Sequence, residues 1–277
     1  MKIGLLVDIT ENWREKLRHA VSLGFDRGQI AIWDMSFYTD ENAKLLKEYL
    51  EEIGFTPTDL WCGWSEPVKW NYPDKYTTLG LVPKEHRERR LQDLLEGGRF
   101  AHKLGIKNVV SHTGFIPDNP FAEEHIGVVE SLKVLCSELK ERGQTFSFET
   151  GEELPVTLSQ MIIEIGLDNV GVNFDPANLL AGGRGNPNDA LALLSSKIFG
   201  VHAKDSVPPK FGETGGHQVL IGTGGVDFER LFRQLKDAGY DGDVSIEHEM
   251  YSENRDRDII ESRKYLEEII SRVYGDN

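Results

Sequence analysis

The chain has 277 residues, with 31 Lys and Arg residues against 46 Asp and Glu, and a formal net charge of −15 at pH 7. This balance argues against nucleic acid and anionic membrane surfaces as partners, because both require a cationic face. The sequence contains no run of about 18 apolar residues, the length needed to span a bilayer. The apolar patch at residues 3–7 is too short for a signal peptide. The two cysteines provide neither a disulfide framework nor a cysteine zinc cluster. We therefore expect a soluble, cytoplasmic globular protein.

Short apolar or β-branched runs alternate with longer segments of helical periodicity along the whole chain. The runs predict eight strands, at residues 2–9, 29–33, 58–63, 108–113, 145–150, 170–175, 198–204 and 243–248. The segments between and after them predict eight helices, at residues 12–23, 40–53, 84–104, 121–142, 154–165, 189–195, 228–238 and 256–274. Cys136 falls on the apolar face of the fourth helix, which indicates a small core side chain rather than a reactive thiol.

Eight strands that alternate with eight helices indicate parallel pairing with right-handed crossovers. An open doubly wound sheet would need a glycine-rich turn after the first strand, but residues 8–11 read Asp-Ile-Thr-Glu. We therefore predict that residues 1–277 form a single (β/α)8 TIM-barrel domain. The two longest irregular stretches, residues 64–83 and 205–226, follow strands three and seven and should lie on the catalytic face.

Polar residues at the carboxyl ends of barrel strands converge over the barrel mouth. Strands five to eight end in Phe-Glu149-Thr, Phe-Asp175-Pro, Val-His202-Ala and Ile-Glu247-His. Each residue also has a simpler interpretation: Asp175 could cap a helix that starts with proline, His202 could be a hydrogen-bonded histidine, and the glutamates could be solvated. Their coincidence at one height favours a shared cation, because burying three carboxylates around one point is otherwise costly. This oxygen-rich set favours Mn²⁺, with Mg²⁺, Co²⁺ or Zn²⁺ as alternatives.

These strand endings, written out as Phe-Glu-Thr-Gly, Asn-Phe-Asp-Pro-Ala-Asn, His-Ala-Lys-Asp and Ile-Glu-His-Glu, resemble the xylose isomerase-like TIM barrel superfamily. Within it they are most similar to the sugar phosphate isomerase/epimerase group. The segment Leu-Ile-Gly-Thr-Gly-Gly-Val-Asp-Phe at residues 220–228 is similar to that group's motif before helix seven. The resemblance covers essentially the whole chain and is specific for the superfamily, but not for the substrate.

The resemblance to the ketose 3-epimerases of this group implies that Glu149 and Glu247 both ligate the metal and form the acid/base pair, with Asp175 and His202 as the other ligands. A cation that polarises a carbonyl would let one carboxylate remove the proton on the next carbon and the other return it. The group often has a histidine three residues after the strand-six aspartate, where this chain has Asn178. An amide still binds a hydroxyl but takes no proton at pH 7, so the sugar and the reaction subtype are open.

Other residues are predicted to contact a sugar or polyol substrate. His112 ends strand four, Trp33 ends strand two, and His217 lies in the long loop after strand seven. Lys204 shares the face of His202 and could place a positive charge beside an enediolate or a substrate carboxylate, or form an ion pair with an acid such as Asp205.

Two loops have alternative interpretations. The glycine-rich segment at residues 222–225 is expected to form a tight turn rather than a phosphate loop, because it lacks a P-loop lysine. Arg184, in Gly-Gly-Arg-Gly at residues 182–185, could reach an anionic substrate.

Glu152 is expected to be a solvated loop acid, although it could bond a hydroxyl. His248 alternates away from Glu247 and should face the helices.

We predict a metal-dependent sugar epimerase or isomerase that could form a homo-oligomer. One alternative keeps the same site but expels a β-hydroxyl, as a dehydratase of a keto-inositol. A metal-dependent endonuclease of the related barrel fold needs several metals and a basic face, which the net charge disfavours. A non-enzymatic sugar-binding barrel is the fourth hypothesis.

Overall fold

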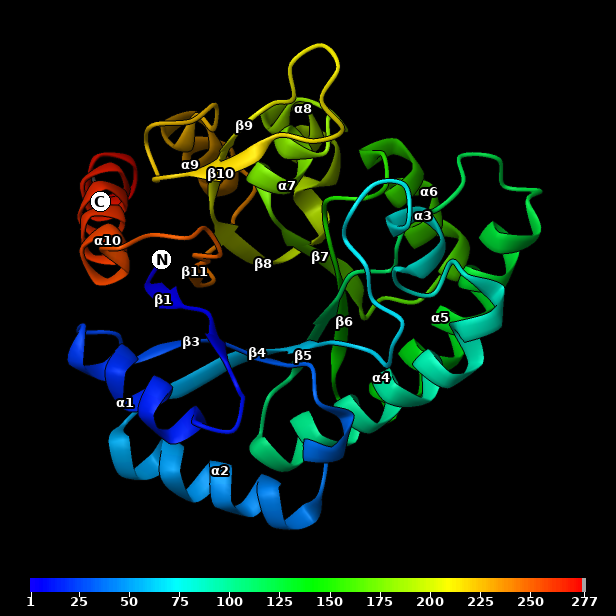
Figure 1. Cartoon of the computed structure of the whole chain (residues 1–277), viewed down its shortest axis with the longest axis horizontal. Helices are drawn as coiled ribbons and strands as arrows, with labels where there is room; N and C mark the ends of the chain where they lie inside the picture. The colour runs from blue at the N-terminus through cyan, green and yellow to red at the C-terminus, as the bar shows by residue number, and fades with distance from the viewer. Residues whose placement is uncertain (276–277) are drawn as a thin grey trace.

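The computed structural model describes residues 1–275, so residues 276 and 277 of the predicted domain lie outside the described residues. Its main sheet has nine strands in the order β1-β11-β8-β7-β6-β5-β4-β3-β2, and neighbours pair in parallel (Figure 1). These strands are β1 (Ile3–Leu5), β2 (Val7–Asp8), β3 (Arg27–Ile32), β4 (Thr56–Cys62), β5 (Asn108–Ser111), β6 (Thr145–Glu149), β7 (Val170–Phe174), β8 (Ile198–Ala203) and β11 (Val244–Ile246). All the predicted strands are therefore present.

The first predicted strand is split at Leu6 into β1 and β2, and its two halves bond to different neighbours. β1 pairs with β11, whereas β2 pairs with β3. Because the two halves are consecutive in the chain, the two ends of the sheet meet and the sheet runs round as a barrel. Gly28 permits the close crossing of β1 and β3, since a Cβ there would lie 1.8 Å from the Leu5 carbonyl oxygen. The predicted (β/α)8 barrel is confirmed.

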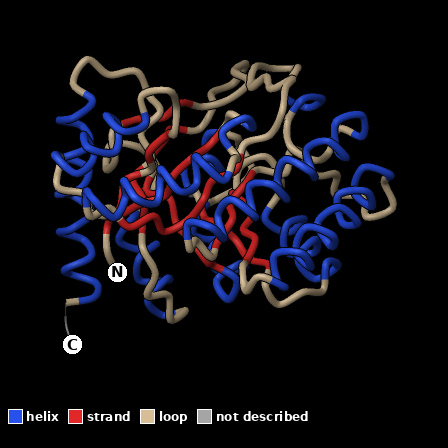
Figure 2. The backbone as a smooth tube through the Cα atoms, turned by 90° about the horizontal axis from the view of Figure 1, so that it is seen from below, coloured by secondary structure: helices blue, strands red, loops and turns tan. Residues whose placement is uncertain are grey.

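Helices surround the strands on the outside of the barrel (Figure 2). The predicted helices correspond to α1 (Trp13–Ser22), α2 (Asp40–Ile53), α4 (Lys84–Leu104), α5 (Glu123–Glu141), α6 (Pro155–Ile165), α8 (Pro187–Leu194), α9 (Phe228–Asp237) and α10 (Arg255–Tyr274). Alternation of strand and helix holds throughout, so every helix returns the chain to the bottom of the barrel and every strand ends at its mouth.

The predicted strands and helices do not include several short elements, all of which lie in loops at the mouth except the 3-10 turn between α8 and β8, at the opposite end of the barrel. These are α3 (Lys75–Thr78), α7 (Pro176–Ala181), the antiparallel pair β9 (Asp205–Val207) and β10 (His217–Val219), and the 3-10 turns η1 (Met35–Phe37) and η2 (Ser195–Lys197). Such short segments carry too few residues for a periodicity to be recognised. They matter here because most of them lie in the loops that surround the candidate site.

The core is continuous between barrel and helices, because the strands bury apolar side chains on both faces. Ile30, Leu60 and Phe146 are fully buried in the strands, and Leu135 and Cys136 are fully buried in α5. Burial raises the pKa of the Cys136 thiol, which agrees with its prediction as a core side chain. Within residues 1–275, no helix combines the length and the apolar character needed to cross a membrane.

Candidate active site

The four predicted metal ligands meet at the mouth of the barrel. Glu149 ends β6, Asp175 follows β7, His202 lies in β8 and Glu247 follows β11. One ligand atom from each lies within 4.8 Å of the others, and all four side chains are buried. Among the described residues, this is the one group of three or more histidine, cysteine or acidic side chains with a geometry suited to a metal ion.

His202 is oriented by an amide behind it. Its Nε2 lies 2.8 Å from Oε1 of Gln29, and Nε2 of Gln29 donates to Oδ1 of Asn173 at 2.8 Å. Because Oε1 of Gln29 must accept, this series of hydrogen bonds places a proton on Nε2 of His202, and Nδ1 faces the carboxylates. Nδ1 lies 2.9 Å from Glu149 and 3.1 Å from Glu247. Burial acts to lower the pKa of His202, but these two carboxylates outweigh it and raise the pKa well above its usual range.

Asp175 caps a helix, as one interpretation of its sequence context suggested, and its second carboxylate oxygen takes no part in the cap. Its Oδ1 accepts from the backbone N–H of Asn178 at 2.8 Å and so caps α7, whose first residue is Pro176. Its Oδ2 is buried without a hydrogen-bond partner and lies 3.7 Å from Nδ1 of His202. A buried carboxylate oxygen without a partner is costly, and a cation is the most effective way to compensate it.

The donor set therefore fits a divalent cation. Three carboxylates and one imidazole nitrogen form a hard, oxygen-rich group, which suits Mn²⁺ or Mg²⁺ better than a closed tetrahedral zinc site. The unpartnered oxygen of Asp175 lies 3.7 Å from Nδ1 of His202, the nitrogen that would ligate an ion once it has lost its proton. Glu149, Asp175, His202 and Glu247 are the residues that would hold the ion.

Lys204 lies beside the carboxylate cluster and points to the same side of the strand as His202, as predicted. Its Nζ lies 3.1 Å from Oε2 of Glu247 and 3.8 Å from Oδ2 of Asp175, and it also contacts Glu249. Burial acts to lower the pKa of Lys204, but these acids outweigh it and raise the pKa well above its usual range. The alternative of an ion pair with a neighbouring acid is therefore present, but the partners are Glu247 and Glu249 rather than Asp205.

Asp205 instead binds the glycine-rich turn after β10. Its carboxylate accepts from the backbone N–H groups of Ser206, Gly222, Gly224 and Val226 at 2.8–3.0 Å. The amide hydrogens that could hold a phosphate are therefore taken by a side chain of the same protein. This supports the tight turn predicted for residues 222–225.

Three further side chains contact Glu149. Asn178 Nδ2 lies 3.3 Å from its Oε1, the indole N–H of Trp61 donates to its Oε2, and His112 Nε2 lies 3.6 Å from Oε2. Burial acts to raise the pKa of Glu149, but the imidazoles of His112 and His202 outweigh it and lower the pKa. The residue is therefore held in its carboxylate form, as a proton acceptor requires.

Glu152 is not the solvated loop acid that the sequence suggested. It is buried, and its Oε2 lies 2.8 Å from Nδ1 of His112. Glu153 beside it is also buried, and neither of its carboxylate oxygens has a hydrogen-bond partner. Burial raises the pKa of Glu153 to about 8, and Glu152 adds to this effect, whereas His112 and Arg184 oppose it. Adjacent acids before a helix give no sequence signal of such burial.

We expect Glu153→Gln to stabilise the protein most at alkaline pH. The pKa of Glu153 is about 8 in the fold and near its usual value of 4.5 in the unfolded chain, so ionisation costs stability as the pH rises between these values. Urea unfolding should show an advantage for the variant that grows by on the order of 3 kcal/mol from about pH 5.5 to 8.5. The exposed Glu141→Gln is the matched control. An equal difference at both pH values would contradict the burial argument.

A cavity of about 870 Å³ opens above the cluster. Of the predicted substrate contacts, Trp33, His112, Asn178 and Lys204 line it. His217 does not line it, and its side chain is exposed on β10. Asp8 ends β2 and also lines the cavity, although it is not among the predicted site residues. The strand-end criterion that selected the cluster residues would also have selected Asp8.

One wall of the cavity is aromatic. The ring of Trp33 lies 4.7 Å from that of Trp61 and 6.4 Å from that of Trp70, and Trp70 lies 5.5 Å from the imidazole of His112. Trp33 is 38 % exposed and Trp70 is 47 % exposed, so both present ring surface to the cavity. Aromatic faces of this kind stack on the C–H faces of sugars.

Arg90 holds the loop that carries this wall. It is fully buried in α4 and donates to the backbone carbonyl oxygens of Ser65, Pro67 and Gly80. These acceptors lie near the two ends of residues 64–83, so one guanidinium ties both ends of the loop to the barrel. Five fixed N–H donors suit arginine to this role.

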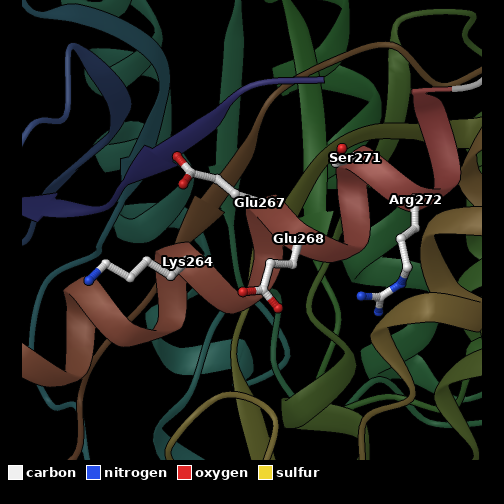
Figure 3. Close-up of a pocket in the computed structure, with 5 residues that line it drawn as sticks. All are labelled: Lys264, Glu267, Glu268, Ser271 and Arg272. Carbon is white, nitrogen blue, oxygen red and sulfur yellow. The ribbon is translucent and has the colours of Figure 1, made fainter.

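A second hollow lies on the outer surface, away from the mouth. It is lined by Lys264, Glu267, Glu268, Ser271 and Arg272, all from α10 (Figure 3). These residues belong to the second half of a helix that starts at the mouth and runs toward the bottom of the barrel. Glu267 pairs with Arg263, and Arg272 pairs with Glu229, so the hollow contains locally paired surface charges and none of the predicted site residues.

Fold and site together define a closed α/β barrel with a buried carboxylate–histidine cluster at the carboxyl ends of its strands. The chain belongs to the xylose isomerase-like TIM barrel family, whose model matches residues 17–269. The family resemblance drawn from the strand endings is thereby confirmed.

Individual relatives share this architecture over nearly their whole length. The L-ribulose-5-phosphate 3-epimerase UlaE of Escherichia coli is 27 % identical over 95 % of this chain and 90 % of its own. The crystal structure of a xylose isomerase domain protein from Planctomyces limnophilus has a TM-score of 0.92 at 26 % identity and covers 99 % of this chain and 98 % of that one. A xylose isomerase-like TIM barrel protein from Mycobacterium smegmatis, in complex with magnesium, has a TM-score of 0.72 at 18 % identity, covering 94 % and 89 %.

Proposed function

We propose that this protein is a divalent-metal-dependent sugar epimerase or isomerase that moves a proton on the carbon next to a carbonyl group. The observation that carries the proposal is the buried cluster of Glu149, Asp175, His202 and Glu247, whose ligand atoms lie within 4.8 Å of one another. The epimerase activity named for the Escherichia coli relative supports the same class of reaction.

The cation would polarise the substrate carbonyl and so acidify the neighbouring C–H. Glu149 and Glu247 come from strands β6 and β11, which are separated in the barrel by β7 and β8. They therefore approach a sugar at the mouth from different sides. One carboxylate takes the proton to give an enediolate, and the other returns a proton to the opposite face, which inverts the carbon. Proton return to the adjacent carbon would instead interconvert an aldose and a ketose.

Neighbouring side chains provide the remaining functions. Lys204 places a positive charge beside Glu247, where it would stabilise negative charge that develops on a substrate oxygen. Asn178 lines the cavity beside Glu149 and can bind a hydroxyl without exchanging protons. Trp33 and Trp70 would cover the apolar side of the sugar and exclude water from the reacting carbon.

The test is solvent proton exchange. The protein is incubated in D₂O with Mn²⁺ and a panel of ketopentoses, ketohexoses, matching aldoses, their phosphates and a keto-inositol, and the products are followed by NMR and mass spectrometry. We expect one deuterium at the carbon next to the carbonyl in at least one sugar. A mass loss of one water from a keto-inositol would favour the dehydratase instead. Binding without exchange across the whole panel would overturn the proposal in favour of a sugar-binding barrel.

A further inference from the structure

The lining of the cavity above the cluster includes two cations that form no ion pair with any described residue. Lys75 of α3 and Arg184, which follows α7, both line it together with Glu149 and Glu247. Both lie against the same ring: Lys75 Nζ is 5.4 Å and Arg184 Cζ is 4.9 Å from the centroid of Phe115. Three loops, after β4, β5 and β7, thus bring Lys75, Phe115 and Arg184 together.

Both charges are uncompensated. Within residues 1–275 neither Lys75 nor Arg184 forms an ion pair, whereas Lys69 of the same loop pairs with Asp74 at 3.2 Å. Both side chains are half-buried, and Nε of Arg184 is buried without a hydrogen-bond partner. In a chain with 46 acidic residues and 31 basic ones, carboxylates are abundant. Contact with Phe115 holds the cations in place without neutralising them.

Glu153, which interacts electrostatically with Arg184, does not neutralise it effectively. Burial raises the pKa of Glu153 to about 8, so that near neutral pH this carboxyl is largely protonated. Glu152 is engaged with His112 at 2.8 Å. Lys204, which also lines the cavity, is surrounded by acids, unlike Lys75 and Arg184.

Gly151 and Gly182 line the cavity together with Asn178 and Arg184. Asn178 contacts Glu149, and a Cβ at Gly151 would lie 3.0 Å from the Cβ of Asn178. A Cβ at Gly182, two residues before Arg184, would lie 2.9 Å from the carbonyl oxygen of Gly151. Glycine at these two positions therefore lets the loops after β6 and β7 pack closely where they line the cavity.

We infer that Lys75 and Arg184 form an anion-binding subsite for the far end of the substrate, so that the substrate is an anionic sugar whose phosphate or carboxylate group is remote from the reacting carbon. This inference rests on the proposed function for the identity of the reacting end. The subsite itself follows from the position and the missing partners of the two cations. Charge-assisted hydrogen bonds to an oxyanion would satisfy the free Nε–H of Arg184 and the Nζ of Lys75.

The test compares three ketoses with the same carbon skeleton: one with a terminal phosphate, one with a terminal carboxylate, and the neutral sugar. Steady-state kinetics are measured for the Mn²⁺-loaded wild type and for Lys75→Ala, Arg184→Ala and the double variant. We expect kcat/KM for the preferred anionic sugar to fall about 10- to 100-fold in each single variant, mainly through KM. The value for the neutral sugar should change less than about threefold. The anionic sugar with the larger loss identifies the group that is bound.

Lys210→Ala is the matched control, because Lys210 is an exposed cation in the neighbouring loop after β8 that does not line the cavity. Equal losses for the neutral and the anionic sugars would overturn the inference, as would a preference that disappears in Arg255→Ala but not in the double variant. Arg255 lines the same cavity from α10.

Titration calorimetry with inorganic phosphate provides a readout without turnover. We expect binding to the wild type and a loss of at least about tenfold in affinity in the double variant. If no sugar is turned over but this loss is observed, the subsite stands and the proposed reaction fails. If neutral sugars are turned over and phosphate binds both proteins equally, the reaction stands and the subsite is overturned.

Discussion

Glu247→Gln should lower kcat by about 10³-fold or more on any sugar that exchanges solvent deuterium. The amide keeps the shape of the side chain but cannot accept a proton, so one of the two carboxylates needed for inversion is lost. Glu247 also contributes an oxygen to the cluster and contacts Lys204 at 3.1 Å. The measurement is steady-state turnover at saturating Mn²⁺, with metal content determined on the same sample, so that lost chemistry is separated from lost metal.

Glu253→Gln is the control for this variant, because Glu253 is an exposed acid in the same segment after β11. It should retain wild-type turnover. Circular dichroism and urea unfolding should show that both variants are folded. Turnover within about threefold of the wild type in Glu247→Gln would remove this residue from the acid/base pair.

Removal of divalent metal should abolish turnover, and Mn²⁺ should restore it. The buried carboxylates of Glu149, Asp175 and Glu247 converge on one point, and His202 directs a nitrogen toward it. Without a cation, Lys204 and a protonated His202 must balance the carboxylates, and nothing polarises the carbonyl. Exhaustive chelation, followed by dialysis and titration with Mn²⁺ or Mg²⁺, measures both the loss and the recovery.

Metal binding should also stabilise the fold, because a ligand that binds only the folded state raises the melting temperature. The increase in Tm on adding Mn²⁺ should be present in the wild type and absent in Asp175→Asn, in which one buried oxygen becomes an amide. Asp189→Asn, at an exposed site in α8, should respond like the wild type. Unchanged turnover after chelation, together with no change in Tm, would contradict a metal at this cluster.

The barrel and the cluster residues could be predicted because both depend on local sequence. A buried parallel strand is recognisable in the sequence as a continuous apolar run, and all strands of the barrel end at the same mouth. The last few residues of four runs therefore contain Glu149, Asp175, His202 and Glu247. Asp8 follows the same logic on the first strand. A cytoplasmic location and a homo-oligomer stay predictions.

The sequence by itself thus determined the fold class and which side chains gather at the mouth. Only the tertiary structure decided the environment of the loops. The burial of Glu152 and Glu153, the acids that surround Lys204, and the meeting of Lys75 with Arg184 over Phe115 depend on how loops of different strands pack together. No periodicity constrains such contacts, because loop conformation follows from long-range packing rather than from the spacing of neighbouring residues.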